Sequence, residues 1–455
     1  MNNKLIKRRK FLKKSTLTSM SLFISPSFNL IKNPKLNKIR IGVIGVGLRG
    51  QWHIDLILRR NDVEIPVICD IDETMIGLAI KKFDQAGKAH PKIYQKGEHD
   101  YLNMLKKESL DGVIIATPWK WHASMSVAAM NYEKHVGVEV PAALTIDECK
   151  NLVETSKTSG KFCMILENVC YRRDVMAVLN MVRKGLFGNL LHCQGGYQHD
   201  LRNVKFNDGK NPYGNGFEFG KKAFSEARWR TQHSVERNGD LYPTHGVGPI
   251  SSMLNINRGN RFLHLTSTST QSLGLNKYIV DNMGINHPNA SVKFALGDIV
   301  TTVIKCSNGQ TVMLSHDTNS PRPYSLNFRV QGTQGIWMKD NNSIYIEGLS
   351  PSKHKWESDK YYLQKYDHPI WKRYESEATG AGHGGMDYFI IRAFIESIKR
   401  ETSPPLDVYD AVSMSVISPL SEESIAKGSS PIKFPDFTRG TWKTNEPIFG
   451  LNDDY

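Results

Sequence analysis

A glycine-rich turn between a predicted strand and a predicted helix restricts the first part of this chain to one class of fold. The strand is the β-branched run Ile39–Ile44, and the turn that follows reads GVGLRG. In this G-x-G-x-x-G setting the first glycine permits a tight turn, the second lets a pyrophosphate approach the backbone, and the third lets the helix pack closely on the strand. The N–H groups that begin the helix then face the phosphates. The pattern predicts a Rossmann domain that binds a dinucleotide through Gly45, Gly47, Leu48, Arg49 and Gly50.

A carboxylate follows the second predicted strand at the spacing that such a domain requires. The strand Val63–Cys69 ends at Asp70, 20 residues after Gly50. A carboxylate in this position accepts hydrogen bonds from the ribose hydroxyls of the dinucleotide. Neither Ile71 nor Asp72 is a cation that could bind a 2′-phosphate. The expected cofactor is therefore NAD rather than NADP.

Strands and helices continue to alternate after this point. The runs 111–117, 135–140 and 161–167 are predicted strands, and Thr145 with Glu148 forms a capping box that opens a helix ending near Ser159. Ligands of parallel sheets bind outside the carboxyl ends of the strands. For Trp119 and Trp121, ordinary packing is an open alternative. We expect the following strand-end residues around the cofactor: Trp119, His122, Glu139, Val140, Glu167 and Asn168.

The pattern changes after Tyr171. A helix is predicted from Val175 to Lys184, and longer alternating strands follow, including Ile299–Lys305 and Thr311–His316. Such strands are typical of a largely antiparallel sheet. The fold class expected is α/β: a doubly wound parallel sheet in residues 37–168, followed by an α+β substrate-binding and catalytic domain in 169–455.

Three clusters in the second domain carry side chains suited to proton transfer. They are Gly195–Asp200, Leu241–Pro249 and Arg322–Tyr324. Tyrosine and histidine exchange protons with hydroxyl groups or acidified carbons when their surroundings tune the pKa. A polar cluster that only holds a loop together is the alternative, and the residues alone leave both interpretations open.

Charge is concentrated at the start of the chain. The formal net charge is +14, of which +10 falls in residues 1–38. Paired Arg8 and Arg9 precede Phe11-Leu12 and a moderately apolar stretch, so residues 1–36 are interpreted as a twin-arginine export signal, with a basic tail as the alternative. No stretch approaches the ~20 apolar residues of a membrane span. The remaining charge, about +4, is dispersed and does not favour nucleic-acid binding.

The six cysteines show no C-x-x-C pair or other metal-ligand spacing. We therefore expect neither a metal site nor a disulfide framework. Cys69 and Cys163 lie within apolar runs and are expected to be buried.

Several long motifs resemble those of a known family. The chain resembles the Gfo/Idh/MocA oxidoreductase superfamily and, within it, the NAD-dependent α-N-acetylgalactosaminidases of glycoside hydrolase family 109. One departure from the superfamily is Glu139-Val140-Pro141, where its sugar dehydrogenases usually have Glu-Lys-Pro. Valine cannot carry a proton, which favours the glycosidase branch. The segments that carry the resemblance are 47–51, 119–122, 167–173, 196–200, 242–246 and 382–388.

The resemblance implies a redox-neutral glycoside cleavage. NAD would take hydride from C3 of the sugar, the ketone would acidify C2–H, elimination would release the C1 substituent, and water addition and reduction would complete the cycle. This route does not need the two flanking carboxylates of ordinary glycosidases. Under the resemblance, Tyr197 is assigned as the base at C2, and His245 with Tyr242 serves the O3 proton. The substrate contacts implied are Tyr197, Arg230, Tyr242, Pro243, Thr244, His245 and Tyr324, with Glu167 and Asn168 flanking the nicotinamide.

Three alternatives stay open at this point. They are a net NAD-dependent sugar dehydrogenase, a sugar-binding protein without activity, and the same chemistry on a different glycoside. The expected partners are a glycan with terminal N-acetylgalactosamine and, as an alternative to a monomer, further copies of the chain. The expected location is the periplasm.

Overall fold

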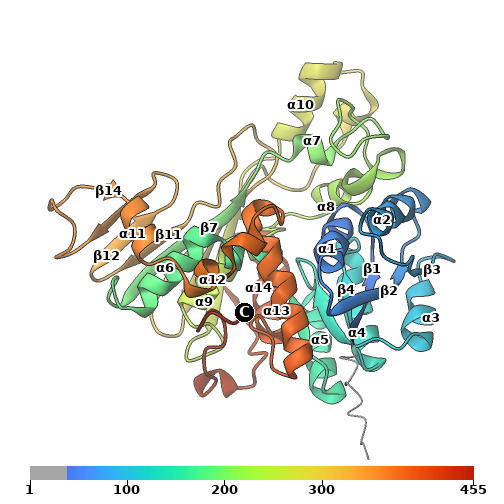
Figure 1. Cartoon of the computed structure of the whole chain (residues 1–455). Coiled ribbons are helices and arrows are strands. Elements are labelled where there is room, and N and C mark those ends of the chain that lie inside the picture. The colour runs from blue at the N-terminus through green and yellow to red at the C-terminus, as the bar shows by residue number, and fades with distance from the viewer. Residues whose placement is uncertain (1–37) are drawn as a thin grey trace, which may run out of the picture. The chain divides into compact units, whose positions relative to one another are not determined.

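Six parallel strands form the first sheet of the structure, a computed structural model that describes residues 38–455 (Figure 1). Their order is β3-β2-β1-β4-β5-β6, which is the strand order of a Rossmann fold. The prediction of a doubly wound parallel sheet is confirmed. The strands are β1 (Ile39–Ile44), β2 (Val63–Cys69), β3 (Lys92–Tyr94), β4 (Gly112–Ile115), β5 (His135–Val138) and β6 (Cys163–Ile165).

Two glycines make the turn between β1 and α1 possible. Gly45 has φ +87°, and a Cβ built there would lie 2.6 Å from the carbonyl carbon of Ala116. A Cβ on Gly50 would lie only 2.0 Å from the carbonyl oxygen of Gly45. Because such contacts are far inside van der Waals distance, neither position admits a side chain without a shift of the backbone.

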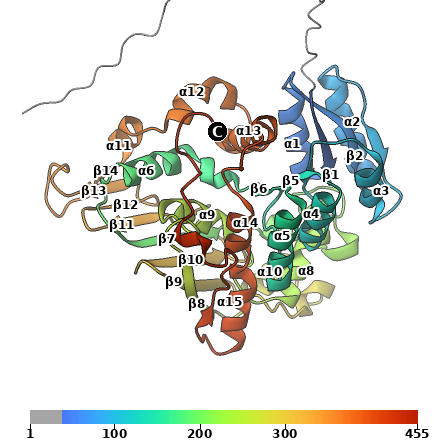
Figure 2. The ribbon, with the colours of Figure 1, turned by 90° about the horizontal axis from the view of Figure 1, so that it is seen from below.

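Helices cover both faces of this sheet (Figure 2). On one face α1 and α2 pack beside α13, whose Phe394 and Ile398 lie against β4 and β5. On the other face α4 and α5 pack beside α14. Since α13 and α14 come from the end of the chain, residues 38–455 form one structural unit. The helices are α1 (Leu48–Leu58), α2 (Glu73–Gln85), α3 (Asp100–Lys107), α4 (His122–Asn131), α5 (Ile146–Ser159), α13 (Met386–Arg400) and α14 (Val408–Ser415).

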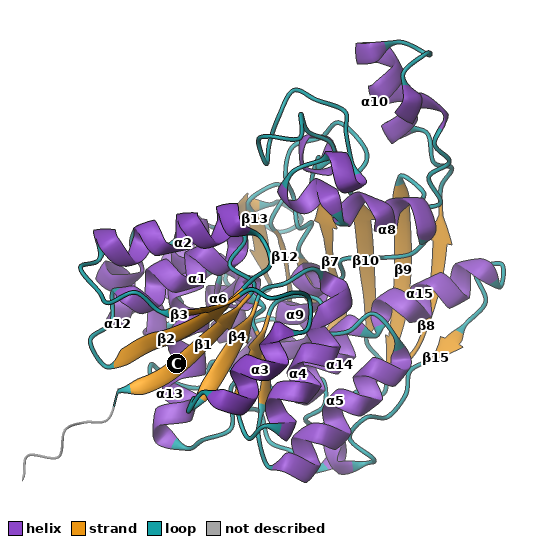
Figure 3. Cartoon of the chain, turned by 90° about the vertical axis from the view of Figure 1, so that its right-hand side faces the viewer, coloured by secondary structure: helices purple, strands orange, loops and turns teal. Residues whose placement is uncertain are grey.

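The second sheet has nine strands, in the order β14-β13-β12-β11-β7-β10-β9-β8-β15 (Figure 3). Neighbouring strands are antiparallel except β7 and β10, which are parallel. The prediction of a largely antiparallel second sheet is confirmed. The strands are β7 (Leu190–Gln198), β8 (Phe262–Ser269), β9 (Ile299–Cys306), β10 (Thr311–Asp317), β11 (Arg329–Gly332), β12 (Gly335–Met338), β13 (Ser343–Ile346), β14 (Glu357–Ser358) and β15 (Ile432–Lys433).

Helices also pack around the second sheet, and α7, α8 and α10 lie at one end of it (Figures 1 and 3). Near α10 a separate small core forms from Phe206, Phe217, Leu275, Ile279, Ala290 and Phe294. The remaining helices are α6 (Arg173–Arg183), α7 (Arg202–Lys205), α8 (Arg230–Glu236), α9 (Thr244–Met253), α10 (Gly274–Met283), α11 (Lys360–Lys365), α12 (Pro369–Ala378) and α15 (Ile417–Ala426).

Local predictions are confirmed in type at most elements, but three predicted strands are shorter in the structure. The strands predicted over 111–117 and 135–140 are reduced to β4 and β5. Thr145 and Glu148 form the capping box of α5. The strand predicted over 161–167 is shorter, because Glu167 accepts a hydrogen bond from the N–H of Val169 and caps a short 3₁₀ turn, Asn168–Tyr171. The six cysteines are buried and unpaired.

Two further expectations concern membranes and export. Within residues 38–455 no helix has the length and apolar character that a membrane crossing demands. The proposed export signal lies outside the described residues.

Candidate active site

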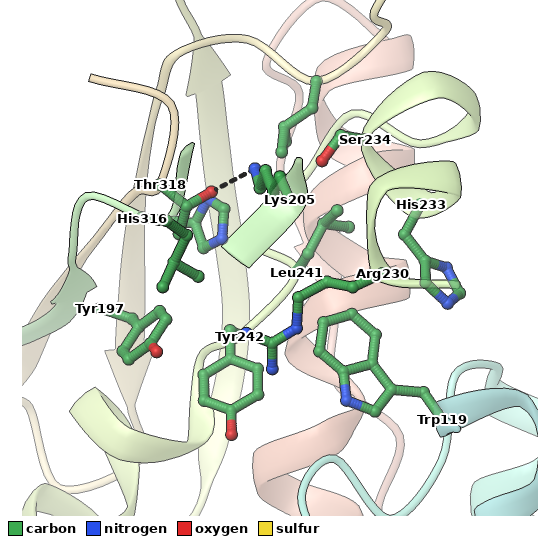
Figure 4. A pocket seen from close by; sticks show the side chains of 12 residues that line it. Trp119, Tyr197, Lys205, Arg230, His233, Ser234, Leu241, Tyr242, His316 and Thr318 are labelled. Carbon is green, nitrogen blue, oxygen red and sulfur yellow. Dashed lines mark hydrogen bonds between the residues drawn. The ribbon is translucent and has the colours of Figure 1, made fainter. Parts of the chain in front are cut away.

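Two hollows meet at Tyr197, near the carboxyl end of β7. The larger, called here the outer cleft, has a volume of about 1220 Å³ and is lined by residues that include His199, His245 and Tyr324. The smaller, the inner pocket, is lined by residues that include Trp119, Arg230 and Tyr242 (Figure 4). Tyr197 lines both. Because it borders both spaces, Tyr197 occupies the centre of the candidate site.

Three predicted catalytic side chains lie together at this point. The ring centroids of Tyr197 and Tyr242 are 4.6 Å apart, and that of His245 lies 5.4 Å from Tyr197 and 4.9 Å from Tyr242. His245 belongs to the first turn of α9, which packs against β7. The structure thus brings together two sequence clusters that lie more than 40 residues apart.

A buried carboxylate fixes the orientation of His245. Nδ1 of His245 lies 2.8 Å from Oε1 and 2.9 Å from Oε2 of Glu167, whose side chain is fully buried. This contact directs the other ring nitrogen, Nε2, away from the carboxylate and makes it the atom available for proton transfer. Glu167 is expected from the sequence to flank the nicotinamide, but in the structure it acts first as a positioning residue for His245.

The Glu167→Gln variant tests this positioning role. We expect kcat to fall about 10²-fold with little change in KM, because a neutral amide stabilises the protonated imidazole less well than a carboxylate does. Glu167→Asp, which keeps a carboxylate, should retain more of kcat than Glu167→Gln, and steady-state kinetics of both variants measure the difference. Equal losses in the two variants, or a loss confined to KM, would contradict the role.

Arg230 lies behind the two tyrosines. Its guanidinium carbon is 5.0 Å from the ring centroid of Trp119 and 5.3 Å from that of Tyr242, and it pairs with Glu226 at 3.1 Å. Burial raises the pKa of Tyr197, and the positive charge of Arg230 opposes this rise. Arg230 therefore favours the phenolate form that a base at this position requires.

The opposite side of Tyr197 faces the outer cleft. Its hydroxyl oxygen is 3.3 Å from Nδ1 of His199, whose ring stands edge-on to Tyr324 at 5.0 Å. Tyr324 is half exposed and can contact a ligand in the cleft. Pro243 and Thr244 do not line either hollow; Pro243 precedes α9 and Thr244 begins it, so they position His245.

The glycine-rich turn fits a dinucleotide. A Cβ built on Gly47 would meet no atom within 4 Å, so the space above the second glycine is open. The N-terminus of α1 has no side-chain cap and no acidic residue in its first turn. Asp70 is held in place because its two oxygens accept hydrogen bonds from the N–H groups of Val46, at 2.7 Å, and Asp72, at 2.9 Å. These residues would hold the pyrophosphate and a ribose of NAD.

The open space at Gly47 gives a direct test. Gly47 has φ −64°, a value open to any residue. We expect Gly47→Val to weaken NAD binding at least ~100-fold, because two methyl groups would occupy the pyrophosphate space, while the thermal unfolding midpoint without NAD stays within about 2 °C. Calorimetric titration with NAD measures the first effect. Unchanged affinity would exclude this turn as the phosphate site.

Other residues expected at the cofactor make internal contacts. Arg49 binds Glu139 at 2.6 Å and Asp387 through two bonds of 2.8 and 2.9 Å, and Asn168 donates to Asp387 at 2.7 Å. Both ring nitrogens of His122 lie 2.7 Å from backbone carbonyl oxygens. The side chain of Val140 is buried. These contacts hold the polar side chains in place around the space beside the glycine-rich turn.

Several residues of the site could not be identified from the sequence. Asp387 lies inside a segment that carries the family resemblance, but nothing in the sequence indicated that it contacts Arg49 and Asn168. His199 also lies in such a segment, next to Tyr197. Lys205 and His316 of the inner pocket carry no signal in the sequence, because each is a single polar residue with no spacing rule.

The fold and the glycine-rich turn define an NAD-binding Rossmann domain of the oxidoreductase type. Residues 39–167 match the oxidoreductase family with NAD-binding Rossmann fold known as GFO_IDH_MocA. Among solved structures, a myo-inositol dehydrogenase from Lactobacillus casei in complex with NAD(H) and myo-inositol has a TM-score of 0.59 at 15% identity, covering 88% of this chain and 97% of that one. An NAD binding oxidoreductase from Klebsiella pneumoniae has a TM-score of 0.64 at 15% identity, covering 88% of this chain and all of that one. These likenesses describe the fold alone.

The second domain narrows the class further. Residues 171–444 match the C-terminal domain of glycosyl hydrolase 109. A glycosyl hydrolase family 109 protein of Stenotrophomonas maltophilia is 50% identical over 455 residues, which is 99% of each chain. An alpha-N-acetylgalactosaminidase of Tannerella forsythia is 53% identical over 417 residues, 91% of this chain and 89% of that one. The chain belongs to glycosyl hydrolase family 109, and it is an NAD-binding glycoside hydrolase.

Proposed function

We propose that this enzyme removes terminal α-N-acetylgalactosamine from glycoconjugates by a redox-neutral, NAD-dependent route. The observation that supports this most directly is the Glu167–His245 pair beside Tyr197, in a chain with an NAD-binding domain. The Tannerella forsythia relative, whose name states this activity, is 53% identical. The choice of sugar rests on that relative.

The cofactor and the side chains divide the chemistry. When bound, NAD supplies reversible hydride acceptance at C3 of the sugar. His245 Nε2 takes the O3 proton, and Glu167 stabilises the imidazolium that results. The C3 ketone acidifies C2–H, so Tyr197, aided by Arg230, can remove that proton as the C1 substituent leaves. Water then adds at C1 as a hydroxyl group, and the proton that it releases balances the one that the departing alkoxide takes up. The two side chains return their protons to C2 and O3 as the hydride returns to C3.

The acidic residues of the outer cleft do not favour the ordinary glycosidase mechanism. That mechanism needs a general acid of raised pKa opposite a second carboxylate. Asp174 pairs with Arg172 and Lys339, and although burial alone would raise its pKa, these cations hold it below the usual value. Asp367 pairs with Arg173, Asp359 accepts from the indole of Trp337, and Asp340 accepts from the hydroxyl group of Ser325. These four carboxylates have other partners and are poorly suited to donate a proton to the glycosidic oxygen.

Cleavage in heavy water tests the proposal. With nitrophenyl α-N-acetylgalactosaminide we expect release of nitrophenol at catalytic amounts of NAD, deuterium at C2 of the product, and no steady accumulation of NADH. Nitrophenyl glycosides of other sugars report the choice of sugar. Equal cleavage after complete removal of NAD would overturn the proposal.

A net sugar dehydrogenase is the second candidate, because the fold neighbours include inositol dehydrogenases. It predicts one NADH for each sugar oxidised. Val140 argues against this second candidate. The sugar dehydrogenases of the Gfo/Idh/MocA superfamily usually carry a lysine at this position, whereas this chain has a buried valine.

We also propose export through the twin-arginine pathway to the periplasm. The support is Arg8-Arg9 ahead of an apolar stretch in a chain that folds around a cofactor. Replacing both arginines by lysine should retain the enzyme in the cytoplasm, and unchanged export would contradict the proposal.

A further inference from the structure

The inner pocket is lined on its far side by several residues that the proposed mechanism does not use, and by Arg230, which also aids Tyr197. Lys205 belongs to α7 and His316 to β10, and Thr318 directly follows β10 (Figure 4). Arg230 and His233 belong to α8. The pocket leaves about 20 Å³ of room for the centre of a small particle. This room is enough for a water molecule or a small ion.

Lys205 is a buried cation without a carboxylate partner. Its side chain is 3% exposed, and its Nζ donates to Oγ1 of Thr318 at 2.8 Å and to Oδ1 of Asn319. Across residues 38–455, no carboxylate oxygen lies within 4.0 Å of this nitrogen. An ammonium group buried beside neutral partners is costly. Accordingly, burial and then the charge of Arg230 lower the pKa of Lys205 to about 7.

Other nitrogens at the pocket also lack partners. Nδ1 of His316 and Nδ1 of His233 are buried and make no hydrogen bond within the described chain. His316 is 3% exposed. Buried polar atoms of this kind are normally satisfied by water or an ion. The side chains lining the pocket include two cations and two histidines and no aspartate or glutamate.

We propose that the inner pocket is a binding site for a monovalent anion of halide size, held by Lys205 and Arg230. The buried ammonium group of Lys205, which has no carboxylate partner, favours an anion, and the small volume of the pocket suits chloride or bromide. An anion there compensates the buried ammonium group and gives the ring nitrogen of His316 a partner. The site is separate from the open space at Gly47, and it borders the reaction centre, because Tyr197 and Arg230 also line the pocket.

Bromide and thermal unfolding test the site without any measurement of catalysis. Crystals of the full chain soaked in sodium bromide should show one anomalous peak within contact distance of Lys205 Nζ. In solution, replacing gluconate by chloride at constant ionic strength should raise the unfolding midpoint by about 1–3 °C, because a ligand that binds only the folded state stabilises it.

Two variants complete the test. Lys205→Met should abolish the chloride response, whereas Lys427→Met, an exposed lysine paired with Glu423, should keep it. A pocket that contains only water in the bromide crystal, or a response to chloride that persists in Lys205→Met, would overturn the proposal. If Lys205→Met does not fold, the bromide crystal of the wild type still decides it.

Discussion

The Tyr197→Phe variant is expected to lower kcat by about 10³-fold and to stop deuterium exchange at C2. General bases contribute 10²–10⁴-fold in comparable reactions, and phenylalanine removes the proton-accepting oxygen while keeping the ring. The ring contacts with Tyr242 and His245 are retained. The hydroxyl group lies 3.3 Å from Nδ1 of His199 and also interacts with Arg230, so the loss of stability should be about 1 kcal/mol.

The measurement separates Tyr197 from His245. Proton NMR of the sugar in heavy water follows exchange at C2, and NADH absorbance in a single turnover follows oxidation at C3. Tyr197→Phe should still produce the NADH signal, because the O3 proton belongs to His245. The control is Tyr278→Phe on α10, where the hydroxyl group donates to Asn203 away from the site. Full exchange at C2 in Tyr197→Phe would remove Tyr197 from the role of base.

Most of the fold was predictable because its signals are local. The turn at Gly45–Gly50, the position of Asp70 and the capping box at Thr145 each depend on residues close in sequence. Their physical requirements, a tight turn, a spaced carboxylate and a satisfied helix end, can be recognised from residue types alone. The parallel pairing of β7 with β10 was not predictable, since these strands are separated by more than 100 residues.

The residues of the candidate site could be predicted in part from the sequence, but the contacts between them could not. The sequence indicated Tyr197, Tyr242 and His245, whose residue types suit proton transfer. It could not indicate that Glu167 faces His245, because that contact spans 78 residues and depends on the short turn after β6. Lys205 acquires its special environment only when α7 packs against the end of β10, and a single lysine in a sequence carries no information about such burial.

A buried ion-pair network joins the glycine-rich turn to the end of the chain. Arg49, on the first turn of α1, contacts Glu139 after β5 and Asp387 on α13. His53 adds a contact of 2.7 Å to Glu139. Burial opposes ionisation of Glu139 and Asp387, but Arg49 and the adjacent histidines outweigh it and hold the pKa of both carboxyl groups well below the usual range. Both carboxylates therefore share one guanidinium as a partner.

Arg49→Met is expected to reduce the free energy of unfolding by about 3–5 kcal/mol at pH 7, because it leaves two buried carboxylates without their cation. Arg59→Met on the same helix is the control: its exposed pair with Asp55 should contribute less than about 1 kcal/mol. Urea unfolding of both variants measures the difference. A loss in Arg49→Met as small as that in Arg59→Met would show that the network contributes no more than a surface pair.

The dependence on pH provides an independent check of the same network. A carboxyl group whose pKa is depressed in the folded state stabilises the protein above its unfolded pKa, about 4, and this contribution disappears as the pH falls toward the folded pKa. Wild type should therefore lose more stability than Arg49→Met between pH 7 and about pH 3, and the gap between them should narrow. Protonation neutralises the carboxylates that Arg49→Met leaves without the guanidinium. If the difference in free energy of unfolding between wild type and variant stays constant with pH, it arises from packing rather than from charge.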